Sequence, residues 1–266
     1  MSYLAVEGDR RIYAEHHRGP GRPVVLVHGY GVSGQCWDTV LPALRANGNE
    51  VVLLDHRACG RSDKNFDDVF ISALGSDVAA VCERLQLHHP VLNGWSLGGA
   101  VAVDAAARLG SNISGLVLTG GATPRNTPAP DWAHGGMLTN VEGVLAGLAA
   151  DRAATLKGVA QAVCARPVSA EVVTWMWNMF LQASPRADDS LRDLAELDQR
   201  KTLSSLGVPV LSLHGRQDVF MSFSGAEAAV ALCADGRLVE FPECGHAPFL
   251  EDRDTYLREL LGFLNR

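Results

Sequence analysis

Residues 92–99, LNGWSLGG, constrain the fold of this chain more than any other stretch. An apolar run at 90–92 leads into them, and a run of small residues at 100–109 leads out. The pattern predicts a strand, a very tight turn and a helix, with Ser96 at the turn. A serine on so sharp a bend crowds its neighbours. The residues two before and two after it, both glycine here, are therefore expected to lack side chains for steric reasons.

Strand and helix patterns alternate along most of the chain. The segments expected to be strands lie at 24–27, 51–54, 91–92, 113–119, 209–213 and 237–241, preceded by a short antiparallel pair around residues 8–9. Between them lie helical patterns, including one over 37–46 and one over 71–85. Alternation of this kind predicts an α/β fold with a mostly parallel, doubly wound sheet. Such sheets bind ligands at the carboxyl ends of their strands.

The pattern changes between residues 122 and 205, where no strand-like run occurs and helical stretches dominate. We therefore predict a core of residues 1–121 and 206–266, with 122–205 inserted as a helical cap. Aromatic residues of the cap favour an apolar substrate pocket. The residues expected to bind substrate are Trp95, Trp132, Trp175, Trp177, Phe180 and Val219.

Three residues at expected strand ends have the side chains needed for nucleophilic catalysis. A serine hydroxyl is a poor nucleophile until a base takes its proton and a third group orients that base. Asp218 follows the strand that resumes the sheet after the insertion, and His246 follows the last strand. The order Ser96, Asp218, His246 is the one used by enzymes in which the serine occupies a strand–helix turn. We expect these three residues to be catalytic.

The negative oxygen of a tetrahedral intermediate requires two hydrogen-bond donors. One is expected to be the amide of Leu97, directly after the nucleophile at the start of a helix. The other is expected to be the amide of Tyr30, in the glycine-containing loop after the strand at 24–27. His28, beside that loop, is expected to support it by hydrogen bonds.

The chain resembles the α/β-hydrolases along nearly its whole length. The motifs that carry the resemblance are HGYG at 28–31, DHR at 55–57, GRS at 60–62, GWSLGG at 94–99, HGRQD at 214–218 and GHAPF at 245–249. Among these enzymes it is most similar to small bacterial carboxylesterases and cofactor-free haloperoxidases, and its turn and GHAPF segment also resemble the pimeloyl-ester esterases and some acyl-homoserine lactonases. The resemblance implies an α/β-hydrolase fold and ester hydrolysis through an acyl-enzyme, without metal or cofactor.

Several alternatives share this machinery. A lactone hydrolase or a carbon–carbon bond hydrolase would use the same three residues, and a ligand receptor derived from the fold would retain them without fast turnover. The serine nucleophile excludes the dehalogenase and epoxide-hydrolase branches, which use an aspartate. Gly31 stands where perhydrolases often have proline. Gly31→Pro is therefore expected to favour perhydrolysis, provided that residue 31 has a φ angle that proline can adopt.

The composition of the chain limits the kinds of molecule that it is expected to bind. The formal net charge of −7 argues against nucleic acid and anionic membrane surfaces. The first eleven residues lack an apolar signal segment, and no later run is long enough to span a membrane, so a cytoplasmic protein is expected. The six cysteines form no metal-binding or paired motif and are expected to be free thiols. The expected partner is a small ester or lactone, and the sequence does not predict the oligomeric state.

Overall fold

The computed structural model describes residues 2–266, within which eight strands form one sheet in the order β1-β2-β4-β3-β5-β6-β7-β8. The strands are β1 (Ser2–Glu7), β2 (Arg10–His17), β3 (Gly21–Val27), β4 (Asn49–Asp55), β5 (Val91–Trp95), β6 (Gly115–Thr119), β7 (Val210–Gly215) and β8 (Gly236–Phe241). β2 runs antiparallel to both β1 and β4, and the other neighbours are parallel. This sheet confirms the expected fold class.

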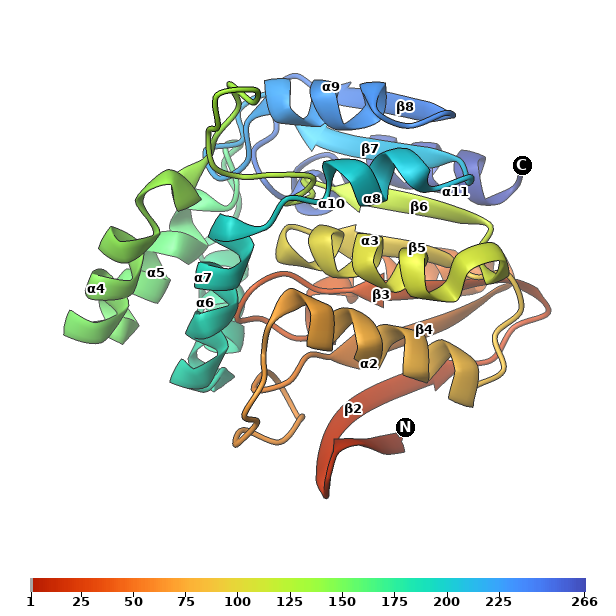
Figure 1. Cartoon of the computed structure of the whole chain (residues 1–266), viewed down its shortest axis with the longest axis horizontal. Coiled ribbons are helices and arrows are strands. Elements are labelled where there is room, and N and C mark those ends of the chain that lie inside the picture. Colours follow the sequence, from red (N-terminus) through yellow and green to blue (C-terminus); the bar gives the residue numbers. More distant parts are fainter. Residues whose placement is uncertain (1) are drawn as a thin grey trace.

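Helices cover both faces of the sheet. In Figure 1, α2 (Ile71–Arg84), α3 (Leu97–Leu109) and α8 (Arg200–Ser205) lie across the near face, with α11 (Arg253–Leu264) behind. The remaining core helices are α1 (Leu41–Ala46), α9 (Phe223–Ala231) and α10 (Pro248–Glu251). α2 and α3 approach closely at Gly75, where a Cβ atom would lie 2.2 Å from Asp104 Oδ1. The central strands are buried between these layers, so their apolar runs need no polar alternation.

Four helices between β6 and β7 gather beyond the carboxyl ends of the strands (Figure 1). They are α4 (Val141–Ala150), α5 (Arg152–Ala162), α6 (Ala170–Gln182) and α7 (Asp189–Glu196), joined to short 3₁₀ turns η3 (Met137–Asn140) and η4 (Pro185–Asp188). α8, at the end of the predicted cap segment, instead packs against α3 of the core. The amide of Gln199, just before α8, donates to Pro124 O (2.8 Å), and Thr123 Oγ1 donates to Gln199 Oε1 (2.9 Å). The segment therefore leaves and rejoins the core at adjacent points.

One expected helix differs from the structure. The helix predicted over 37–46 is split into a 3₁₀ turn η1 (Gly34–Trp37) and α1, which begins only at Leu41. Pro42 lies in the first turn of α1, where its missing N–H group leaves no hydrogen bond unmade. The apolar periodicity continues through η1, which is why one helix was predicted. Pro42 instead favours a helix that begins at Leu41.

Candidate active site

Ser96 occupies the junction between β5 and α3 in a strained backbone conformation, with φ +56° and ψ −125°. The glycines on either side of Ser96, Gly94 and Gly98, are required because other backbone atoms approach them closely. A Cβ atom on Gly94 would lie 2.1 Å from Gly98 O, and one on Gly98 would lie 2.4 Å from Val27 O. The backbone can therefore pass this point only without side chains on either side of the serine. Ser96 lies directly before the N-terminus of α3, which favours negative charge.

Asp218 lies in the loop after β7 and is bonded on both carboxylate oxygens. Oδ2 accepts from His246 Nδ1 (2.8 Å), and Oδ1 accepts from the amides of Phe220 (2.8 Å) and Met221 (3.0 Å). A second imidazole, that of His214, has Nε2 3.4 Å from Asp218 Oδ2. The carboxylate thus has fixed partners on both sides.

The environment of Asp218 favours its charged form. Burial alone would raise the pKa of Asp218, but the charge and hydrogen bond of His246, the charge of His214 and the Met221 amide together hold this pKa below its ordinary value. Ionisation of Asp218 therefore stabilises the fold above the ordinary pKa of an aspartate. That contribution is lost as the pH falls through the lowered pKa.

The loop that carries His246 is fastened on several sides. The His246 amide donates to Val163 O in the cap segment (2.8 Å), and Trp95 Nε1 donates to His246 O (2.9 Å). Gly120, with φ +47°, passes close beneath, since a Cβ atom there would lie 2.9 Å from His246 O. The backbone on both sides of the imidazole is therefore held in place by core and cap.

Glu251, which ends α10, is a buried carboxylate that binds this loop through backbone amides. It accepts hydrogen bonds from the amides of Gly245 (2.9 Å) and Ala247 (3.3 Å), the two neighbours of His246. It also accepts from the amides of Ala165 (2.7 Å) and Arg166 (2.9 Å) in the cap segment. One side chain thus joins the histidine loop to the cap, a role that the sequence analysis missed because the partners are all main-chain groups.

Replacing Glu251 with glutamine is expected to destabilise the protein by about 2–4 kcal/mol, because an NH₂ donor would then face buried N–H groups. Turnover is expected to fall as well, since the peptides flanking His246 lose their common acceptor. Denaturant unfolding and steady-state kinetics measure the two effects. Glu243→Gln, an exposed change in the same loop, is the matched control. An unfolding free energy for Glu251→Gln within about 0.5 kcal/mol of the wild type would contradict this role.

The loop after β3 has a peptide orientation set by His28. The amide of His56 donates to His28 Nε2 (2.9 Å), so Nδ1 carries the proton and donates to Gly29 O (2.7 Å). Burial lowers the pKa of His28 to about 4, which keeps this ring neutral. In a trans peptide the carbonyl and the amide point in opposite directions. Bonding Gly29 O to His28 therefore directs the Tyr30 amide away from His28.

Gly29 itself lies against Ser96, because a Cβ atom on it would be 3.1 Å from Ser96 Cβ. Gly31 has φ +68°, a left-handed conformation, and a Cβ atom there would be 3.0 Å from Phe180 Cδ1. Proline requires φ near −65°. The condition attached to Gly31→Pro is therefore not met, and the expected gain in perhydrolysis is withdrawn.

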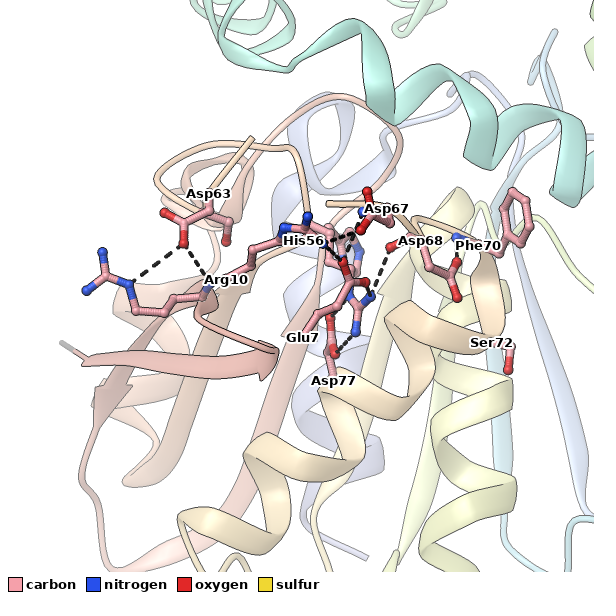
Figure 2. A network of polar contacts seen from close by, with 12 residues as sticks. Glu7, Arg10, His56, Asp63, Asp67, Asp68, Phe70, Ser72 and Asp77 are labelled. Carbon is pink, nitrogen blue, oxygen red and sulfur yellow. Dashed lines mark hydrogen bonds and ion pairs between the residues drawn. The ribbon is translucent and has the colours of Figure 1, made fainter. Parts of the chain in front are cut away.

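Figure 2 shows a polar network that joins the first hairpin, the loop after β4 and α2. Arg57, next to His56, binds both carboxylate oxygens of Asp77 in α2 (2.6 and 2.8 Å). Its Nη1 also donates to Glu7 Oε2 (2.7 Å) and Asp68 O (2.9 Å). The loop after β4 is thereby fixed to the first hairpin and to α2. Because His56 belongs to this loop, the network also holds the amide that determines the protonated nitrogen of His28.

A pocket of about 490 Å³, including its open mouth, brings several of these groups together. Ser96, His246, Tyr30, Leu97, Trp95 and Phe180 all line it. Gly29 of the HGYG motif also lines it. The other lining residues, which the sequence analysis missed, are Met137, Leu138, Val159, Val163, Leu191, Leu194, Phe220 and Met221. Most belong to the cap, where only the packing of the helices determines which side faces the core. Phe220 and Met221 were accessible to prediction, because they follow Asp218 by two and three residues.

Four residues expected to bind substrate lie outside this lining. Trp132 is buried, with its indole N–H bonded to Arg125 O (3.1 Å). Trp177 donates to Ala153 O (3.0 Å) and so joins α6 to α5. Trp175 is half-buried against the hydrophobic core, and Val219 is 66% exposed. Trp132 thus fixes its own loop and Trp177 joins two helices, and we do not retain these four as substrate-binding residues.

Residues 2–266 contain no group of three or more histidine, cysteine, aspartate or glutamate side chains placed to hold a metal ion. Within the same residues, no helix has the length and apolar character needed to cross a membrane. All six cysteines are free thiols.

Comparison with known proteins defines the class of this protein. The family model of the alpha/beta hydrolase fold matches residues 22–253, so the chain belongs to that family. It is 34% identical, over 85% of its length and 92% of the relative, to a pimeloyl-[acyl-carrier protein] methyl ester esterase of Aromatoleum aromaticum.

Two solved structures are also similar. An esterase from Exiguobacterium antarcticum superposes with a TM-score of 0.95 at 27% identity, covering 100% of this chain and 99% of that one. A bromoperoxidase from Bacillus anthracis superposes with a TM-score of 0.92 at 26% identity, with both chains fully covered. These likenesses confirm the resemblance to bacterial esterases and haloperoxidases, and the chain is an enzyme of the hydrolase class with esterase-type function.

Proposed function

We propose that the protein is a serine hydrolase that cleaves carboxylic esters of small to medium apolar substrates through an acyl-enzyme. The observation that carries this proposal is the 2.8 Å contact between His246 Nδ1 and Asp218 Oδ2, made by a histidine that lines the same pocket as Ser96. A nucleophile, a base and an orienting acid are the minimum set for this chemistry.

Hydrolysis proceeds in two halves. Ser96 Oγ attacks the ester carbonyl while His246 Nε2 takes its proton, and the imidazolium then protonates the leaving alcohol. The acyl group remains on Ser96 until water, deprotonated by His246, releases the acid. Asp218 keeps the proton of the neutral imidazole on Nδ1 and stabilises the imidazolium without taking the proton itself. The amides of Tyr30 and Leu97 stabilise the oxyanion in both halves.

The pocket supports the choice of an apolar substrate. Beyond the catalytic groups, its lining is dominated by aliphatic, methionine and phenylalanine side chains from the cap and the 220–221 loop. Such a lining favours an uncharged acyl or alcohol group. Trp95 and Phe180 are the aromatic residues that we propose to contact it, since both line the pocket.

A series of p-nitrophenyl esters of increasing acyl length tests this assignment, together with lactones of graded ring substituents. Short esters are expected to give the higher kcat/KM, because the bulky cap side chains of Phe180, Leu191 and Leu194 line the same pocket as Ser96 and limit the length of acyl chain beside it. The Ser96→Ala variant corrects for turnover that does not involve the site. A preference for long-chain lipid substrates would contradict the proposed substrate class, and faster turnover of lactones than of any ester would make the protein a lactonase.

The domain organisation and location are also proposals. We propose that residues 1–121 and 206–266 act as the catalytic core and 122–205 as the cap, since Val163 and Phe180 of this segment line the pocket. We propose a cytoplasmic location, supported by six unpaired cysteines, which are typical of reducing compartments.

A further inference from the structure

The Tyr30 side chain reaches from the core into the cap. Its hydroxyl donates to Asp188 Oδ1 (2.5 Å), and Arg152 Nη1 donates to Asp188 Oδ2 (2.6 Å). Asp188 ends η4 and Arg152 begins α5, so both of these partners belong to the cap segment. The side chains of Arg152 and Asp188 are largely buried, at 21% and 16% exposed. A hydroxyl, a carboxylate and a guanidinium thus join the loop after β3 to two cap elements.

This bond adds to the contacts that hold the backbone around residue 30. His28 holds the peptide before Tyr30 through Gly29 O. The residue after Tyr30 is Gly31, which is buried and has φ +68°, a conformation that glycine adopts without steric cost. The Tyr30 ring is a further means of fixing the conformation at residue 30, and Asp188 holds that ring through its hydroxyl.

The groups around Tyr30 keep its hydroxyl protonated. Burial, followed by the charge and hydrogen bond of Asp188, raises the pKa of Tyr30 well above its ordinary value, so the hydroxyl keeps its proton and remains a donor. Arg152 compensates the carboxylate of Asp188, which would otherwise be a buried and uncompensated charge close to a site that develops negative charge. The charges of Asp188 and Arg152 therefore cancel, and each carboxylate oxygen of Asp188 accepts one hydrogen bond, from Tyr30 or from Arg152.

We propose that Asp188 is a positioning residue that couples the docking of the cap to the geometry of the oxyanion hole, through the Tyr30 hydroxyl. The inference rests on the proposed function, because it concerns the Tyr30 amide as an oxyanion donor. When the cap is docked, Asp188 holds the Tyr30 ring and with it the amide in front of Ser96. Substrate enclosed by the cap therefore meets a completed donor pair.

A double-mutant cycle tests the coupling. Tyr30→Phe removes only the hydroxyl and leaves the amide, and Asp188→Ala removes its acceptor. Each single variant is expected to lower kcat on a short ester about tenfold, less than the 10²–10³ lost with a whole oxyanion donor, while KM changes less than about threefold. The double variant is expected to lose no more activity than Asp188→Ala alone, because the Tyr30 hydroxyl has no acceptor left to lose once the Asp188 carboxylate is gone. Asp188→Asn, whose amide oxygen still accepts from Tyr30, is expected to restore most of kcat.

Glu142→Gln is the matched control, since this cap carboxylate is 72% exposed and is expected to leave kcat unchanged. Additive losses in the double variant would overturn the coupling, as would an effect confined to KM or failure of Asp188→Asn to restore kcat. Ser96→Ala is measured in the same assay. If it is inactive while Asp188→Ala is fully active, only the coupling is wrong, whereas turnover by Ser96→Ala at the wild-type rate would remove the proposed function itself.

Discussion

Replacing Ser96 with alanine is expected to lower ester turnover by at least about 10⁴-fold, because no other group in the pocket can form the acyl-enzyme. The fold is expected to remain intact. Alanine keeps the Cβ atom that already fits at φ +56°, and the glycines that allow the turn are unchanged. Steady-state kinetics on a short p-nitrophenyl ester measure the loss, and thermal unfolding checks the structure.

A serine-directed fluorophosphonate identifies the nucleophile independently. It is expected to label Ser96 in the wild type and no residue in Ser96→Ala. Ser204→Ala, an exposed serine on α8, is the control and is expected to keep both labelling and turnover. If Ser96→Ala retained activity within tenfold of the wild type, Ser96 would not be the nucleophile.

The second large loss of turnover is expected when Asp218 is replaced with asparagine. In Asp218→Asn, the amide oxygen can still accept from Phe220 and Met221, so the NH₂ group faces His246 Nδ1. The imidazole must then carry its proton on Nε2, where it cannot accept the proton of Ser96. We expect kcat to fall by about 10³–10⁴-fold with little change in KM.

Asp235→Asn, an exposed change on the surface, is the control for Asp218→Asn and is expected to be silent. The lowered pKa of Asp218 keeps the carboxylate charged at all pH values near neutrality, so its own titration adds nothing to the pH profile there. Near-normal turnover by Asp218→Asn would mean that a different acid orients His246.

The strand–turn–helix around Ser96 was predictable because its constraint is local. Only glycine fits at 94 and 98, because a side chain there would collide with Gly98 O or Val27 O. The spacing of the two glycines around Ser96 is therefore visible in the sequence. The positions of Asp218 and His246 were predictable for a different reason. Each follows a strand, and parallel strands end at one edge of the sheet. Their mutual contact then required only that both loops turn toward Ser96.

The pocket lining was not predictable from the sequence. Aromatic residues in the cap suggested a substrate site, yet Trp132 and Trp177 use their indole N–H groups to bond backbone carbonyls, whereas Leu191 and Leu194 line the pocket. Hydrophobicity alone does not distinguish packing between cap helices from packing over the nucleophile. The contribution of Glu251 was not predictable for another reason. Its partners are backbone amides, which every residue except proline has, so no residue type in the sequence identifies them.

The adjacent exit and return of the cap segment, at Thr123 and Gln199, make it a replaceable module. Because Gln199 bonds Pro124 O and Thr123 directly, the two ends of the segment are joined on the core by contacts that involve none of the helices α4 to α7. Closing a longer or shorter segment between them changes the loop entropy only slowly with length. Grafting of caps from related hydrolases at these two points thus offers a route to new selectivity, in which the core keeps Ser96, Asp218 and His246 and only the cap residues of the pocket lining are exchanged.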